Sequence, residues 1–105
     1  MVWLKDPQGI YVSCNQRFES FFGHQESEII GKSDYDFVSK DLGDLFRSND
    51  LKVVQSGTTH INEEKVQFAS DGHWELLETI KTPLRDRNGQ LMGVLGIGRD
   101  ISARV

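Results

Sequence analysis

The chain has 105 residues, with 16 acidic and 12 basic side chains and a net charge of −4. A chain of this length hides roughly 60–70% of its unfolded surface on folding, which suffices for one core and excludes a second catalytic domain. Charged residues make up 27% of the chain and are spread beside 6 Phe and 2 Trp, which argues against disorder. Its net acidity and scattered arginines argue against nucleic-acid binding, because phosphate neutralisation needs clustered Lys and Arg. We therefore expect one globular domain over residues 1–105.

The sequence also restricts where the domain works. Its longest apolar run, residues 91–98, is far shorter than the roughly 20 residues of a bilayer-spanning helix, and the N-terminus lacks a signal-peptide pattern. Cys14 is the only cysteine, which excludes an internal disulfide and fits a reducing compartment. We expect a cytoplasmic domain without direct membrane contact, which is compatible with a membrane anchor elsewhere in a longer protein.

The first third of the chain predicts a hairpin followed by short helices. Residues 2–5 and 10–14 are β-prone and flank a turn that contains Pro and Gly. Asn15 is expected to cap a helix, because its side chain can accept a hydrogen bond from the free amides of the first turn. Phenylalanines spaced i, i+3 and i+4 give this helix an apolar face, and it is expected to end at Gly23. Residues 26–30 predict one further helical turn.

The rest of the chain changes from a helical to a strand periodicity. Residues 40–56 predict the one long helix, with a serine before it and a glycine after it. Residues 58–69, 74–84 and 91–100 predict three strands, joined by turns that contain glycine. The order of two strands, several helices and three strands predicts an α+β fold with an antiparallel sheet.

Both faces of the last predicted strand carry apolar side chains. An antiparallel sheet usually keeps one face in water, and the helices here can cover only one face. We expect a flanking helix or a second copy of the domain to cover the other face, since contiguous apolar patches usually mark interaction sites. Dispersed apolar residues without a partner are the alternative. The predicted interface residues are Trp74, Leu76, Ile80, Leu91, Leu95 and Ile97.

Two glycines, Gly96 and Gly98, interrupt the last strand. Glycine inside a strand often marks the close approach of a ligand or of another backbone. Two glycines on one face leave space there, so helices packed above them would enclose a pocket. A bulge or kink near the strand end explains the two glycines equally well.

Several motifs match one known family. The most specific are residues 81–86, which read Lys-Thr-Pro-Leu-Arg-Asp, and residues 96–102, which read Gly-Ile-Gly-Arg-Asp-Ile-Ser. Asn15, residues 34–37 and the turn at residues 71–72 match as well. With these motifs the chain resembles a PAS domain, a sensory module of bacterial signalling proteins, over essentially its whole length. The resemblance implies a five-stranded antiparallel sheet of order 2-1-5-4-3, with helices on one face and a ligand cavity between them.

The resemblance also implies a function. Such a domain would sense a small ligand or a partner, and would regulate a C-terminal effector through rearrangement of a dimer and its linker. The whole protein would typically be a sensor histidine kinase or a diguanylate cyclase, so this fragment is expected not to be an enzyme. A homodimer through the outer sheet face and flanking helices is implied, and the alternative is a ligand-free module that only mediates dimerisation. An enzyme that uses Cys14 and a histidine ranks third, because no orienting third group is evident.

The resemblance disfavours two cofactors and leaves the cofactor unknown. Photoreceptors of the light-oxygen-voltage type bond flavin through a cysteine in the helical region, whereas Cys14 lies in the second strand. They also carry a polar amide where Gly98 stands here. Haem-binding members usually supply a histidine from the long helix, and residues 40–56 contain none. The three histidines lack a metal-ligand spacing, so no metal site is expected.

The resemblance assigns certain side chains to the inner face of the sheet and to the helices above it. An apolar wall with a few polar groups suits a small ligand, although a filled core would use the same residue types. The candidate cavity residues are Cys14, Phe37, Leu45, Phe46, Gln67, Leu77, Thr79, Val94, Gly96 and Gly98.

Four polar residues are predicted to have structural roles: Asn15, Asp34, Asp36 and Lys81. Lys81 lies within a predicted strand, and an ionic group there prefers a hydrogen-bonded partner, for which Asp34 and Asp36 are the candidates. A lysine that extends outward into water is equally compatible with the sequence.

The end of the last strand carries the predicted signal-coupling residues Asp100, Ile101 and Ser102. The Asp100 carboxylate can accept hydrogen bonds from nearby backbone amides, and breaking them would reorient the chain that leaves the sheet. The coupling role follows from the resemblance, and a helix cap is compatible with the same residues. Residues 101–105 are expected to begin the linker to the effector.

Overall fold

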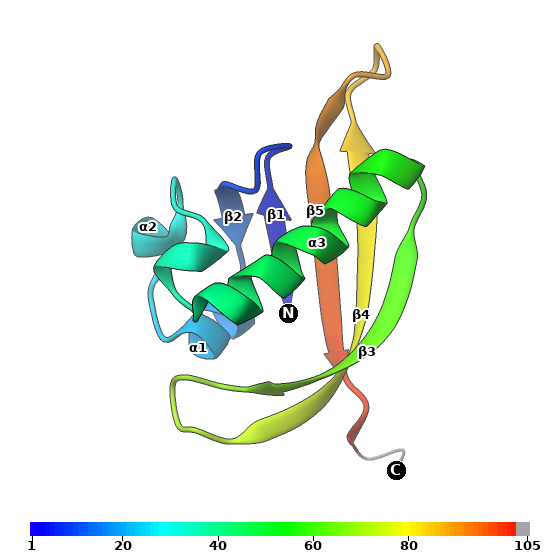
Figure 1. Ribbon diagram of the computed structural model, residues 1–105. Helices are drawn as coiled ribbons and strands as arrows, with labels where there is room; N and C mark the ends of the chain where they lie inside the picture. Colours follow the sequence, from blue (N-terminus) through cyan, green and yellow to red (C-terminus); the bar gives the residue numbers. More distant parts are fainter. Residues whose placement is uncertain (103–105) are drawn as a thin grey trace.

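The structure is a computed structural model that describes residues 1–102, and it forms one five-stranded antiparallel sheet with helices on one face (Figure 1). The strand order is β2-β1-β5-β4-β3, so the predicted α+β class and sheet order are confirmed. The predicted linker lies outside the described residues beyond Ser102. The strands are β1 (Val2–Lys5), β2 (Tyr11–Cys14), β3 (His60–Gln67), β4 (Trp74–Arg85) and β5 (Leu91–Asp100), and the helices are α1 (Gln16–Phe22), α2 (Glu26–Ile29), the 3-10 helix η1 (Asp34–Asp36) and α3 (Lys40–Ser56).

The junction between β2 and α1 is organised by Asn15. Its side-chain oxygen accepts hydrogen bonds from the amides of Phe18 and Val2, each at 3.1 Å. The same side chain therefore caps α1 and ties this helix to β1. The helix ends at Gly23, whose φ of 75° is a conformation that glycine adopts without steric cost.

The long helix α3 crosses the sheet obliquely in front of β4 and β5 (Figure 1). The hydroxyl of Ser39 caps it by accepting a hydrogen bond from the amide of Leu42 at 3.3 Å. The side chains that α3 buries are Asp50 and Val53, and much of its remaining surface is exposed. The helix therefore presents a carboxylate to the interior of the domain.

Aromatic residues form the core between α1 and the β1–β2 side of the sheet. Trp3, Tyr11, Phe18 and Phe22 are all buried there, and the rings of Phe18 and Phe22 lie 4.6 Å apart between centroids. A second cluster of Val66, Phe68 and Leu77 continues the core under β3 and β4, and Phe21 packs against both clusters.

The opposite face of the sheet carries an apolar row. Ile61, Ile80, Ile97 and Val2 are aligned across the four strands β3, β4, β5 and β1. Ile61 is 64% exposed and Ile97 is 41% exposed. Of the predicted interface residues, Leu76, Ile80, Leu95 and Ile97 alternate with buried positions and so lie on this face, and Leu91 is partly buried at the start of β5. Trp74, exposed at the start of β4, instead borders the space beneath α3 that is described below.

Across residues 1–102, every helix is too short or too polar to cross a bilayer.

Candidate ligand cavity and signal exit

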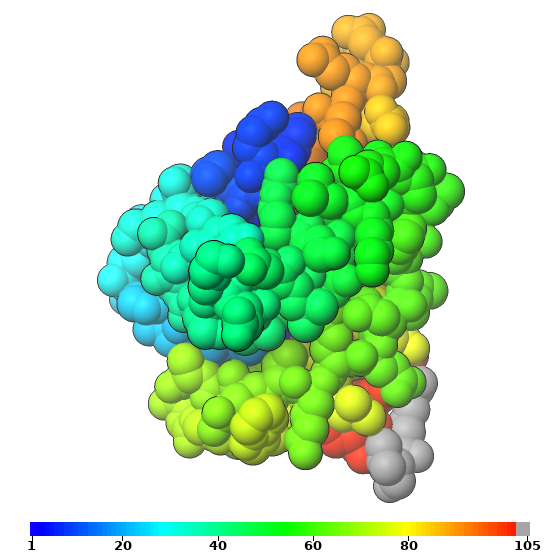
Figure 2. Space-filling model, in the orientation of Figure 1, coloured from blue at the N-terminus to red at the C-terminus, as the bar shows by residue number. Residues whose placement is uncertain are grey.

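A cavity of about 610 Å³ opens between α1, α3 and the edge strand β3. Figure 2 shows it as a groove between α3 and the segment that joins β3 to β4. Its volume lies within the range of small-molecule sites, and its wall is mostly apolar. The lining residues are Phe21, Phe22, Phe37, Val38, Leu42, Leu45, Phe46, Glu64, Lys65, Val66, Gln67, Phe68, Ala69, Gly72 and Trp74.

The structure brings only some of the predicted cavity residues together. Phe37, Leu45, Phe46 and Gln67 line this large cavity. Gln67 does so from an exposed position on β3, where its amide donates to the carbonyl of Gly72 at 3.0 Å. Leu77 and Thr79 line a second cavity of about 30 Å³ deeper under the helices. Cys14, Val94, Gly96 and Gly98 line neither of these two cavities.

The space predicted at the two glycines of β5 is occupied by Trp3. Gly96 lies opposite Trp3 in the β1–β5 ladder, and a Cβ atom on Gly96 would lie 2.1 Å from Cε2 of the indole. At Gly98 the nearest atom to such a Cβ is Leu77 Cδ1, at 3.4 Å. The pocket predicted at these glycines is therefore absent at Gly96, where a side chain of the neighbouring strand fills the room.

Cys14 has an environment that opposes a nucleophilic role. Burial raises the pKa of its thiol to about 11, and the nearby carboxylates of Glu26 and Glu19 add to this rise. The thiol is therefore protonated at neutral pH, whereas the thiolate is the reactive form. Within residues 1–102 there is also no group of three or more His, Cys, Asp or Glu side chains arranged to hold a metal ion.

A buried cluster of charges joins the sheet to the helices. Lys5 Nζ lies 2.5 Å from Asp34 Oδ2 and 2.7 Å from Asp50 Oδ2. Lys81 Nζ lies 3.4 Å from Asp50 Oδ1, and the Tyr11 hydroxyl donates to Asp34 Oδ1 at 2.5 Å. All five side chains are buried. Two ammonium groups thus balance two carboxylates, and they come from β1, β4, η1 and α3.

This cluster corrects the predicted partners of Lys81. Its carboxylate partner is Asp50, not Asp34 or Asp36, because α3 places Asp50 between the two lysines. Asp34 pairs with Lys5 instead, while the exposed Asp36 accepts a hydrogen bond from the amide of Ser33 at 3.0 Å. Lys81 is buried and does not extend into water. Burial and the charge of Asp34 raise the pKa of Tyr11 well above its ordinary value, so this hydroxyl acts as a donor.

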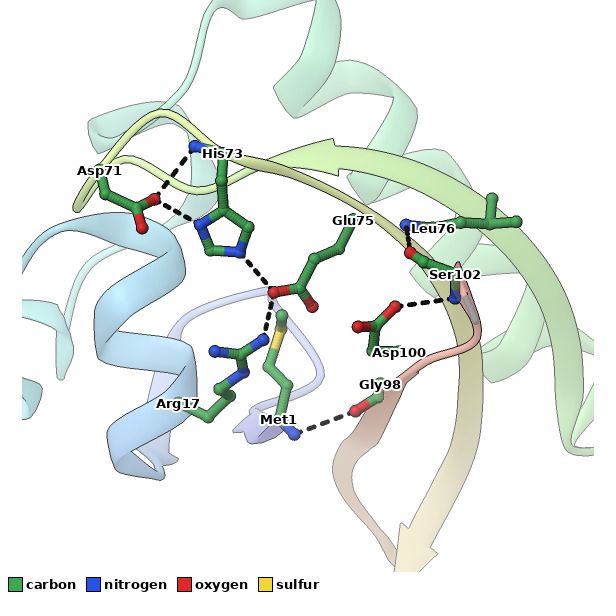
Figure 3. A network of polar contacts seen from close by, with 9 residues as sticks. All are labelled: Met1, Arg17, Asp71, His73, Glu75, Leu76, Gly98, Asp100 and Ser102. Carbon is green, nitrogen blue, oxygen red and sulfur yellow. Dashed lines mark hydrogen bonds and ion pairs between the residues drawn. The ribbon is translucent and has the colours of Figure 1, made fainter. Parts of the chain in front are cut away.

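The end of β5 is fastened to the start of β4 (Figure 3). The amide of Ile101 donates to the carbonyl of Leu76 at 2.9 Å, and the Ser102 hydroxyl accepts from the amide of Leu76 at 3.0 Å. The Asp100 carboxylate in turn accepts from the amide of Ser102 at 2.9 Å. The three predicted coupling residues therefore hold the outgoing chain against one residue of β4.

A polar network lies beside this attachment (Figure 3). The buried carboxylate of Glu75 pairs with Arg17 of α1, and its Oε2 atom lies 2.5 Å from Nε2 of His73. The other ring nitrogen of His73 pairs with Asp71. Hydrogen bonds to Glu75 and then to Asp71 raise the pKa of His73, and hydrogen bonds from His73 lower the pKa of Asp71. No sequence motif indicated this network, because its members come from α1, the β3–β4 turn and β4.

The raised pKa of His73 predicts a pH-dependent contribution to stability. Because its folded-state pKa lies above the unfolded value of about 6.5, the contribution is complete below that value and is lost as the pH rises through the folded pKa. In an NMR titration we expect the His73 ring to titrate with a midpoint above the unperturbed value of about 6.5. The chemical shift of the Leu76 amide is expected to change with the same midpoint. In Glu75→Gln the midpoint is expected to fall. A wild-type midpoint at or below the unperturbed value would contradict this expectation.

Comparison with known proteins gives one consistent result. The family described as "PAS fold" matches residues 1–105. The chain is 33% identical over 101 residues to the methanogenesis regulatory histidine kinase FilI of Methanothrix harundinacea, covering 96% of this chain and 11% of the kinase. It is 27% identical over 103 residues to a diguanylate cyclase of Vibrio cholerae, covering 96% of this chain and 32% of the cyclase. The chain thus spans about a tenth to a third of these relatives.

Solved structures agree with this result. VqmA bound to DPO superposes with a TM-score of 0.86 at 25% identity, over 95% of this chain and 51% of the other. The PAS domain of a protein from Colwellia psychrerythraea superposes with a TM-score of 0.74 at 25% identity, over 98% of this chain and 86% of the other. The chain belongs to the PAS-fold family.

Proposed function

We propose that this domain binds a small, mainly apolar ligand in the 610 Å³ cavity and that binding changes how the outgoing chain is held at Leu76. In a longer signalling protein, this change would regulate an effector that follows Ser102. The histidine kinase and the diguanylate cyclase among the relatives indicate the kind of effector. The complex of VqmA with DPO, a protein of similar fold, supports a ligand in this fold.

The observation that carries the proposal is the physical connection between the cavity and the exit. Phe68 lines the cavity, and its ring stacks on His73 at 4.5 Å and lies 4.6 Å from the guanidinium of Arg17. Both of these side chains hold the carboxylate of Glu75, which precedes Leu76 in β4. A ligand that displaces Phe68 would therefore disturb the residue next to the attachment of Ser102.

A ligand-free scaffold is the second candidate. The indole of Trp3 fills the space at Gly96, and the apolar row of Ile61, Ile80, Ile97 and Val2 offers a surface for a second copy. In this case the domain would only set the geometry of a dimer. The two candidates differ in whether the large cavity takes up a ligand.

Two variants of α3 separate the candidates. Leu45→Trp places a large ring in the cavity, whereas Leu51→Trp changes a residue of the same helix that lies outside the cavity lining. Both leucines are partly exposed, so both variants are expected to fold. For wild type and Leu51→Trp, we expect either a co-purified ligand in native mass spectrometry or thermal stabilisation by a compound of a metabolite library. For Leu45→Trp we expect neither result.

The coupling is measured in the same samples. Ligand binding is expected to shift the NMR signals of the amides of Leu76 and Ser102, and Ser102→Ala is expected to reduce the shift at Leu76 while affinity is kept. Three results together would favour the ligand-free scaffold over the ligand sensor. They are a native mass without bound ligand, no thermal stabilisation by any library compound, and a dimer that forms with rising concentration in sedimentation.

A further inference from the structure

We propose that the ligand is uncharged and that its hydrogen-bond-accepting end enters the 30 Å³ cavity beside Thr79 and Lys81, while its apolar body fills the large cavity. This inference rests on the proposed function. The two cavities share the lining residues Phe21, Phe46, Glu64 and Val66. The small cavity therefore adjoins the large one, and the proposed ligand extends across both.

Two buried polar groups at the small cavity lack full hydrogen bonding. Thr79 is 1% exposed, and its Oγ1 atom has no hydrogen-bond partner among the described residues. Lys81 is 4% exposed, and its Nζ atom contacts a carboxylate only at 3.4 Å. Buried polar groups in folded proteins are nearly always paired, so an unpaired hydroxyl at a cavity indicates a missing partner. Both groups can donate a hydrogen bond, so the partner they fit is an acceptor such as a carbonyl oxygen.

The size of the small cavity limits what enters it. About 30 Å³ of space holds a group of roughly one or two non-hydrogen atoms, since a single water needs about 10–15 Å³ by the same measure. A carbonyl group fits, whereas an aromatic ring does not. The aromatic and aliphatic side chains of the large cavity suit the remaining, apolar part of the ligand.

The charges around the small cavity determine the charge of the ligand. Lys5 and Lys81 already balance Asp34 and Asp50. A carboxylate end would compete with Asp50 for Lys81 and would add an unbalanced negative charge, with Glu64 also at the wall. An ammonium end would face both lysines. Unbalanced buried charge is unfavourable, so a neutral acceptor is the chemistry that the cluster tolerates.

Three probes with the same ring system test this inference: 2-naphthamide, 2-naphthoate and 2-naphthylmethylammonium, which are neutral, anionic and cationic at neutral pH. Their binding to this chain is measured by NMR titration. We expect the amide to bind about tenfold or more tightly than either charged probe, because only the amide keeps the charge balance. In Thr79→Val the affinity for the amide is expected to fall about tenfold, through loss of one hydrogen bond.

Thr79→Val should fold, because its hydroxyl has no partner to lose. Thr82→Val is the matched control on the same strand, since Thr82 lines neither cavity. This variant should bind the amide as tightly as wild type. Equal or tighter binding of a charged probe, an unchanged affinity in Thr79→Val, or no binding of any probe overturns the inference. The proposed function is judged separately, by the co-purified mass and the library, which do not depend on these probes.

Discussion

Lys5→Met is expected to destabilise the domain by about 3–5 kcal/mol, because it leaves two buried carboxylates with one ammonium group. Methionine has nearly the shape of lysine, so packing changes little. The cost arises mainly from the unbalanced charge of Asp34 and Asp50. Urea unfolding monitored by tryptophan fluorescence measures it as a lower midpoint with an unchanged slope.

Lys40→Met is the matched control for this prediction. Lys40 pairs with Asp44 at 3.0 Å, but the lysine is 82% exposed, and such pairs contribute about 0–1 kcal/mol. A similar fall in the free energy of unfolding for both lysine variants would show that the charge balance of the buried cluster does not supply the stability assigned to it.

A double variant separates the charge from other effects of the substitution. Lys5→Met with Asp34→Asn leaves Lys81 paired with Asp50, so the number of buried positive and negative charges is again equal. The asparagine can still accept the hydrogen bond of Tyr11. We expect the double variant to be more stable than Lys5→Met alone. A double variant that is less stable would show that the loss is not one of charge balance.

Local sequence patterns predicted most of the elements of this fold. The spacing of phenylalanines in α1, the capping residue Asn15 and the alternation along β4 are properties of neighbouring residues, and these elements formed near the expected bounds. The sheet order came only from the family resemblance, because strand pairing depends on contacts between distant segments. The strand expected over residues 58–69 is shorter, His60–Gln67, because α3 runs to Ser56 and the turn toward β4 begins at Ala69.

The candidate site was predictable only in part. Phe37, Leu45 and Phe46, three of the candidate cavity residues, line the large cavity. Asp50 was missed as the partner of Lys81, because helical periodicity treats a charged residue as exposed. Its burial follows from where α3 crosses the sheet, and the position of one element over another leaves no local pattern.

Trp3→Ala is expected to cost about 3–5 kcal/mol, because the indole is buried in the aromatic core and its removal leaves a cavity. The indole occupies the space above Gly96 and lines the 30 Å³ cavity. The space left by the substitution therefore has the shape of indole and is bordered by the aromatic core. Added indole is expected to restore part of the lost stability in thermal unfolding, as small apolar molecules do in engineered cavities. Indole should not restore the stability of Lys5→Met, because no such cavity forms in that variant.

The contact between Trp3 and Gly96 can also be tested by a substitution at Gly96. Gly96→Ala is expected to cost about 1–3 kcal/mol, because its Cβ would lie 2.1 Å from the indole, whereas Gly98→Ala meets its nearest atom at 3.4 Å and should cost less. In Trp3→Ala/Gly96→Ala the added methyl group no longer meets the ring. The double variant should therefore be more stable than the sum of the single losses predicts. Strict additivity would mean that Gly96 is required for a reason other than room for Trp3.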